Sequence, residues 1–159
     1  MHIHSAKTLT FLLLLSTLSC YGQNEQIGVV TRVIDGDTID IDIDGKVDRV
    51  RYIGMNTPER DEPCFDEATQ ANVDLVAGHE VRLEKDFSET DRYGRLLRYV
   101  YVGDVFVNKA LVADGYAEAV LYEPDNRYYE LFSELEAEAA QSALGCHESG
   151  IFDDGDARR

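Results

Sequence analysis

The clearest sign of the fold is the run Ile39-Asp40-Ile41-Asp42-Ile43-Asp44-Gly45. Its isoleucines alternate with aspartates, and this period of two predicts a half-buried strand with one face in water. Asp44-Gly45 is a hairpin-turn signal, so residues 47–53 are expected to return as the second strand. Thr57-Pro58 should end that strand, because proline cannot continue a central ladder. The aspartates also resemble the start of an EF-hand loop, but Arg51 stands where that loop needs a bidentate glutamate.

Strands and helices alternate along the rest of the chain. Further strands are predicted over residues 27–34, 80–87 and 96–102, the last continuing toward Phe106. Helices are predicted over residues 65–77, over residues 108–114, and from just after Pro124, with Asp125 or Asn126 as the N-cap. This order predicts an α+β fold dominated by a β-barrel.

The first 22 residues are expected to be an export signal rather than part of the fold. Lys7 supplies a basic start, and residues 9–18 form an apolar run too short to span a bilayer. Cleavage after Gly22 would leave 159 − 22 = 137 residues, secreted or periplasmic. Leu18-Ser19-Cys20 resembles a lipid-attachment signal with its leucine one place too close, which leaves a lipid anchor on Cys20 as an alternative.

The exported chain is strongly acidic and has the length of one domain. It keeps all 31 acidic residues and loses Lys7 from the 15 basic ones, so its formal charge is 14 − 31 = −17. A polyanionic substrate would need a local basic site or a bound cation to overcome this charge. We expect a folded domain over residues 23–147, a flexible acidic tail over residues 148–159, and a monomer with no protein partner.

Two cysteines, Cys64 and Cys146, remain after signal removal. An even pair in an exported protein favours a disulfide, with two free thiols as the alternative. Serine- or cysteine-type hydrolysis is poorly supported, because His79 and His147 are the only histidines left and neither has an evident partner.

Three short runs carry chemistry. Asp35-Gly36-Asp37 comes first, Asn56-Thr57-Pro58-Glu59 follows Arg51, and Asp91-Arg92-Tyr93-Gly94-Arg95 comes last. Each run alone is equally consistent with a turn or a surface ion pair. Together they offer carboxylates and an amide for a hard cation, a glutamate as a base, and arginines for a phosphate. That combination predicts metal-assisted cleavage of a phosphodiester.

These runs, in this order, resemble the staphylococcal nuclease (thermonuclease) family from about residue 29 to residue 144. Val107-Asn108-Lys109-Ala110-Leu111-Val112, followed by Gly115, also resembles a helix of that family. The resemblance implies an OB-fold, a five-stranded barrel with three helices. It also implies Ca²⁺-dependent hydrolysis of DNA and of RNA, with 3′-phosphate ends as products.

The resemblance also implies a metal site. Asp37 would bind Ca²⁺ through its side chain and Thr57 through its backbone carbonyl. Asn56 stands where the best-known member has an aspartate, and its amide oxygen is still a hard ligand with one negative charge fewer. Asp35 would lie behind these ligands and act through water.

The catalytic roles implied by the resemblance belong to Glu59, Arg51 and Arg95. Glu59 would be the general base, and the two arginines would stabilise charge on the phosphate. Arg49 is expected on the same strand face as Arg51, where it would add positive potential.

The substrate cleft is less well matched. Arg92, Tyr93 and Tyr122 would contact the nucleotide, but Val120 replaces a second tyrosine and cannot stack on a base. The alternative function is a catalytically weak OB-fold protein of the cell envelope that binds nucleic acid or calcium. The filled positions at Arg51, Glu59 and Arg95 argue against it.

Overall fold

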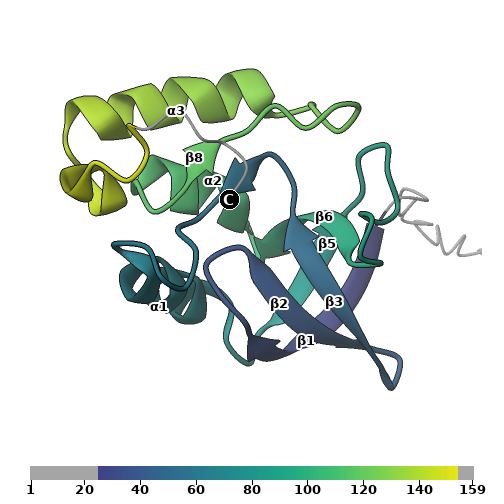
Figure 1. Ribbon diagram of the computed structural model, residues 1–159. Helices are drawn as coiled ribbons and strands as arrows, with labels where there is room; N and C mark the ends of the chain where they lie inside the picture. The colour runs from purple at the N-terminus through teal and green to yellow at the C-terminus, as the bar shows by residue number, and fades with distance from the viewer. Residues whose placement is uncertain (1–24, 154–159) are drawn as a thin grey trace, which may run out of the picture.

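Five strands close into a barrel that encloses the main hydrophobic core (Figure 1). The computed structural model describes residues 25–153, so the expected signal over residues 1–22, Cys20 and the last six residues lie outside it. The barrel strands are β1 (Glu25–Val33), β2 (Thr38–Ile43), β3 (Lys46–Tyr52), β5 (Glu80–Glu84) and β6 (Leu96–Val102). They pair antiparallel in the order β3-β2-β1-β5-β6, and a parallel pairing of β3 with β6 closes the barrel. The expected five-stranded OB-fold is confirmed.

The β2–β3 hairpin follows from the isoleucine–aspartate alternation. Ile39 and Ile41 are fully buried, and Ile39 pairs in register with Val50. Asp44 and Gly45 both have positive φ angles, 52° and 85°, as a tight two-residue hairpin turn of the primed type requires. The turn therefore sets a register that keeps every isoleucine on the core side.

The strand expected over residues 47–53 is confirmed to within one residue as β3, and after a turn the unexpected short strand β4 (Met55–Asn56) pairs with β8 (Glu118–Ala119). The run expected to continue toward Phe106 breaks into β6 and the hairpin strand β7 (Val105–Phe106). The buried amide of Asn108 holds the turn after β3, because its Nδ2 donates to the Ile53 carbonyl at 3.1 Å.

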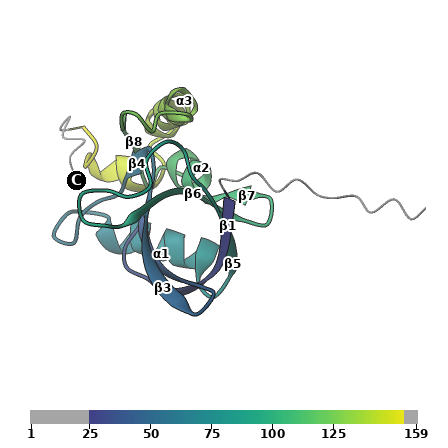
Figure 2. The ribbon, with the colours of Figure 1, turned by 90° about the vertical axis from the view of Figure 1, so that its right-hand side faces the viewer.

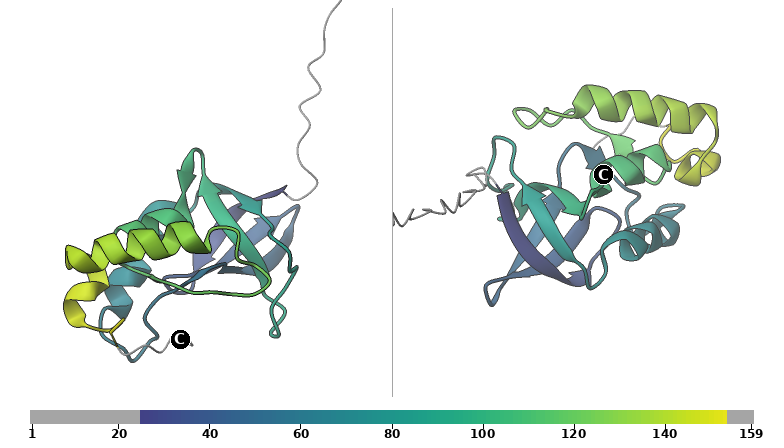
Figure 3. Two further views of the ribbon diagram at one scale, coloured as in Figure 1. Left: turned by 90° about the horizontal axis from the view of Figure 1, so that it is seen from above. Right: turned by 180° about the vertical axis from the view of Figure 1, so that it is seen from behind.

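Three helices surround the barrel. α1 (Phe65–Val76) lies across one end of the barrel in the view down its axis (Figure 2), and α2 (Val107–Ala113) packs beside α3 (Tyr129–Gln141) on its flank (Figure 3). The helices expected over residues 65–77 and 108–114 are confirmed to within two residues. Among the described residues, no helix is long and apolar enough to cross a bilayer.

The expected start of the last helix was wrong. α3 begins at Tyr129, and neither Asp125 nor Asn126 caps it. Asp125 is fully buried, and its Oδ1 accepts the backbone N–H groups of Phe87 at 2.8 Å and Ser88 at 2.7 Å. The carboxylate thus links the segment before α3 to the loop after β5. Local sequence patterns cannot predict such a contact.

The first part of the expected flexible tail is folded. A 3₁₀ helix, η1 (Gly145–Ser149), packs against α1, and Cys146 and Phe152 are buried with Ala68. The sulfur atoms of Cys64 and Cys146 lie 2.14 Å apart, at bonding distance. The disulfide, which would link the start of α1 to η1, stays a prediction for chemical test.

Candidate active site

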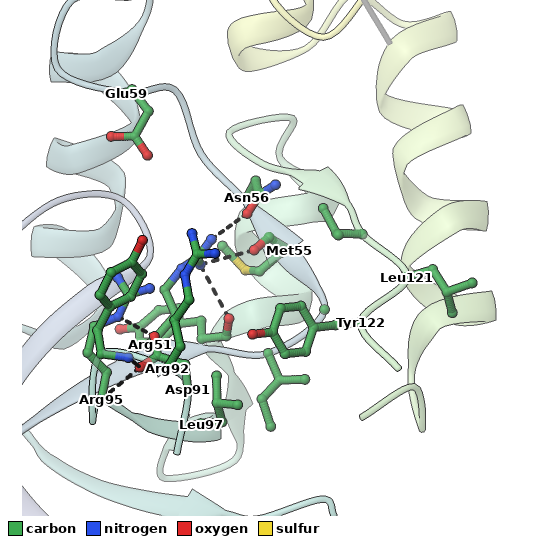
Figure 4. Close-up of a pocket in the computed structure, with 15 residues that line it drawn as sticks. Arg51, Met55, Asn56, Glu59, Asp91, Arg92, Arg95, Leu97, Leu121 and Tyr122 are labelled. Carbon is green, nitrogen blue, oxygen red and sulfur yellow. Dashed lines mark hydrogen bonds and ion pairs between the residues drawn. The ribbon is translucent and has the colours of Figure 1, made fainter. Parts of the chain in front are cut away.

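A cleft of about 610 Å³ gathers residues from five separate parts of the chain (Figure 4). Its walls come from the end of β3, from β4, from the loop before α1, from the 91–95 loop and from the segment after β8. Seven of the residues singled out in the sequence line it: Arg51, Asn56, Glu59, Arg92, Tyr93, Arg95 and Tyr122. Concave sites of this size are where ligands bind in most enzymes.

Arg51 joins the two side chains expected to bind metal. Its guanidinium lies 2.8 Å from the Asp37 carboxylate, donates to the Met55 carbonyl at 3.1 Å and donates to Oδ1 of Asn56. Its side chain is 13% exposed, so these contacts are shielded from bulk water. The sequence suggested a phosphate contact for Arg51, with a surface ion pair as the alternative, whereas the structure makes it the group that aligns Asp37 and Asn56.

The Asp35-Gly36-Asp37 turn is built around close contact with Thr57. Oδ2 of Asp37 accepts both the backbone N–H and the hydroxyl of Thr57, each at 3.1 Å. A Cβ on Gly36 would lie 2.7 Å from the Thr57 side chain, so only glycine permits this approach. Thr57 and Asp37, which are twenty residues apart, are thereby held together.

The donor set at this turn suits Ca²⁺. Burial, and then the nearby Asp37 carboxylate, raise the pKa of Asp35 to about 6, although the backbone N–H of Asp37 opposes the shift. Two carboxylates that destabilise each other's charge favour a cation between or beside them. No group of three or more His, Cys, Asp or Glu side chains suited to a metal occurs among residues 25–153. The ligands expected from the sequence are carboxylate, amide and carbonyl oxygens, which are hard ligands.

Asn72, which the sequence argument missed, supports the same turn from α1. It is fully buried, its Nδ2 donates to the Asp35 carbonyl at 2.9 Å, and its Oδ1 accepts the Tyr52 hydroxyl at 2.9 Å. It lies between Ala68 and Val76 at spacings of four, on the buried face of the helix. A polar residue on the apolar face of a predicted helix could have indicated that Asn72 is buried and hydrogen-bonded.

The 91–95 loop is organised by Asp91, to which the sequence argument gave no role. Oδ2 of Asp91 accepts Nε of Arg95 at 2.6 Å, and its Oδ1 accepts the backbone N–H groups of Tyr93 and Arg95. Burial acts to raise the pKa of Asp91, but these hydrogen bonds outweigh it and hold that pKa below its usual value. The guanidinium of Arg92 lies 4.7 Å from the centre of the Tyr93 ring.

Glu59 lies on the loop before α1, across the cleft from Arg51 and Arg95 (Figure 4). Its side chain is exposed, and its backbone N–H donates to the Glu62 carboxylate at 2.7 Å. This separation leaves space between an acidic group and two basic groups. A phosphodiester with an attacking water could enter that space.

The last wall of the cleft has one aromatic residue. Tyr122 is 42% exposed and projects into the cleft, beside Val120 and Leu121. Val120 therefore leaves Tyr122 as the stacking surface on this wall. Arg49 does not line this cleft, and it pairs with Asp40 at 2.7 Å across the β2–β3 hairpin.

Comparison with known proteins gives consistent results. Residues 49–148 match the family model described as "Staphylococcal nuclease homologue". The chain is 41% identical to the thermonuclease of Staphylococcus hyicus over 122 residues, which cover 73% of this chain and 72% of the relative. It is 40% identical to the thermonuclease of Staphylococcus intermedius, covering 76% and 75% of the two chains. It is also 40% identical to the endonuclease YncB of Bacillus subtilis (strain 168), covering 71% and 57%.

Proposed function

The chain belongs to the staphylococcal nuclease family and is a nuclease, and we propose that it is exported and cleaves DNA and RNA with bound Ca²⁺. We further propose that it leaves 3′-phosphate ends. The observation that carries the proposal is the single cleft lined by Arg51, Arg95 and Glu59, next to the buried Asp37.

Arg51 and Arg95 would bind the scissile phosphate. Guanidinium groups offer paired donors to phosphate oxygens and keep their charge at any working pH. Asp91 orients Arg95, and the carbonyl of Met55 with the carboxylate of Asp37 orients Arg51. Because both groups are held before substrate arrives, they would stabilise the extra charge on phosphorus at little reorganisation cost.

Glu59 would act on the attacking water. Its carboxylate would accept a proton as the water oxygen bonds to phosphorus, in line with the bond to the 5′-oxygen. That bond breaks, the 5′-oxygen takes up a proton from solvent, and the phosphate stays on the 3′-oxygen. Glu59 is exposed to solvent, so the proton can then leave to water.

Asp37, Asn56 and the Thr57 carbonyl would hold Ca²⁺, with Asp35 behind them. The ion would supply positive charge to the phosphate oxygens. Arg51 keeps Asp37 and Asn56 in place, so one guanidinium would serve both the ligands and the substrate. Because of this shared role, loss of Arg51 should affect both the metal ligands and the binding of the phosphate.

The test is a nuclease assay on single-stranded DNA and on RNA with calcium, magnesium or EDTA. We expect turnover with calcium, none with EDTA, and 3′-phosphate ends by end-labelling. Glu59→Gln is the matched control, since it keeps the shape of the side chain and removes the base. Equal rates with EDTA and calcium would overturn the calcium proposal, while a mature N-terminus other than Gln23 would overturn the expected signal cleavage.

A further inference from the structure

A second groove of about 450 Å³ adjoins the active-site cleft. β2 and β3 supply Asp40, Val47 and Arg49, and the 91–95 loop supplies the rest. Tyr93 and Arg95 line both the groove and the cleft. The two concavities therefore share this loop as a common wall, and no step of the proposed mechanism uses the second one.

The charge of the groove sets it apart from the rest of this acidic chain. Its lining holds two arginines and one aspartate, and the lining of the cleft holds three arginines and two acidic residues. Because Arg95 belongs to both linings, the two concavities together hold four arginines and three acidic residues, one excess positive charge on a chain whose formal net charge is −16. By contrast, the pocket beside Cys64 is lined by Glu67 and Glu148 with no basic residue. A local excess of arginine on an acidic chain suits a polyanion.

Exposed apolar surface lies in the same groove. Tyr93 is 69% exposed and Val47 is 58% exposed, although both border a concave site. Unpaired bases stack on an aromatic ring such as that of Tyr93 whatever their sequence, whereas paired bases in a duplex do not offer their faces. Val47 cannot stack in this way, but it adds apolar contact beside the ring. The volume of the groove falls within the range of sites that hold small ligands, so a nucleotide unit fits it.

We propose that this second groove binds the same single strand of nucleic acid beyond the scissile phosphodiester. One strand would occupy the cleft, pass over Tyr93 and continue in the groove. Its base would pack on Val47 and Tyr93, and its phosphate would contact Arg49. The inference rests on the proposed nuclease function, and it makes a long single strand a better substrate than a single nucleotide.

Arg49 can make this contact at modest cost. In the structure its Nε and Nη2 donate to the two carboxylate oxygens of Asp40, at 2.7 and 3.0 Å. Its side chain is 47% exposed, and ion pairs at such positions add little stability. The same paired donors match a phosphate, so arrival of a strand can exchange one anion for another.

The test compares Val47→Glu with Val105→Glu. Val105 is also an exposed strand valine, at 46%, and it lines neither concavity, so both variants add the same charge. One substrate is a single strand of about 12 nucleotides, within the span of one OB-fold. The other is a nitrophenyl phosphodiester of a single nucleoside, which fills only the cleft. Binding of the labelled strand in EDTA, followed by fluorescence anisotropy, gives a readout without turnover.

We expect Val47→Glu to raise the KM and the Kd for the long strand on the order of fivefold, because a carboxylate replaces an apolar contact beside the phosphates of the strand. Its kcat, and both constants for the single-nucleotide ester, should stay unchanged, and Val105→Glu should match the unsubstituted enzyme. Equal KM values for the two variants on the long strand would overturn the proposal that this groove binds the strand. If the unsubstituted enzyme cleaved neither substrate, the nuclease function itself would be overturned.

Arg49→Gln and Lys46→Gln form a second pair. Each removes one positive charge and breaks one ion pair with an aspartate, but Lys46 lines neither concavity. Loss of a phosphate contact should lower the slope of log Kd against log salt by about 0.7 for a single strand. We expect that change for Arg49→Gln alone. The same slope in both variants would remove Arg49 from the proposed contact.

Discussion

Breaking the Cys64–Cys146 link should remove a large share of the protein's stability. The two residues are 82 apart in sequence, so the bond closes a loop that contains two barrel strands, β5 and β6, and the helices α1, α2 and α3. In the chain-entropy model, closing a loop of that length in the unfolded chain stabilises the fold by about 4.5 kcal/mol at 25 °C. For a domain of this size, that loss lowers Tm by about 10–15 °C.

The assay is thermal unfolding followed by circular dichroism, with and without a phosphine reductant. The protein should lack residues 1–22, so that Cys20 adds no thiol. The double variant Cys64→Ser/Cys146→Ser should melt where the reduced protein melts, and reductant should not shift it further. Two alkylatable thiols in the unreduced protein would refute the bond, and a Tm shift under about 3 °C would refute the entropy argument.

Activity gives a second readout of the same bond. Glu59 lies on a loop whose start is held by the contacts between Thr57 and Asp37, and whose end is held by Cys64. Reduction would free the second end of the loop. At temperatures well below Tm, the kcat of the reduced protein should therefore be lower than that of the oxidised protein, while KM changes little. Unchanged kcat in the reduced, folded protein would show that the bond serves stability alone.

Three further outcomes follow from the site. Arg51→Ala, Glu59→Ala and Arg95→Ala should each fold, by circular dichroism, and lose on the order of a hundredfold in kcat; near-normal rates in all three would exclude the mechanism. Asn56→Asp should lower the calcium midpoint of activity, on the order of tenfold, because a carboxylate replaces an amide beside the ion; an unmoved midpoint would place Asn56 outside the ligand set. Asn72→Ala should lower the free energy of unfolding by about 1–3 kcal/mol, because it leaves the Tyr52 hydroxyl and the Asp35 carbonyl without this partner. It should also raise the calcium midpoint of activity. An unchanged denaturant midpoint would show that Asn72 does not support the Asp35 turn.

Local pattern was enough to predict much of the barrel. The alternation at Ile39 and Ile41, the turn at Asp44-Gly45 and the helix at residues 65–77 each depend on neighbours along the chain. Such features carry their own periodicity, and the structure confirms them. The order of the three chemical motifs was likewise enough to identify the family.

Long-range contacts explain what the sequence argument missed. The short strand β4, which was not expected, forms because it pairs with β8, more than sixty residues away. Asp125 does not cap α3, because its Oδ1 instead accepts two backbone N–H groups from the loop after β5. A side chain that could form a local capping hydrogen bond can thus bond instead to a distant segment that only folding brings near.

Spacing and chemical type along the chain are enough to indicate the class of fold, the family and the kinds of residue at the site. How those residues work together depends on the folded chain. Folding joined Arg51 to both Asp37 and Asn56, and it brought Asn72 under the Asp35 turn. It also made the 91–95 loop border two concavities instead of one. Distances between segments far apart in the chain are set by closure of the barrel, and no local pattern encodes them.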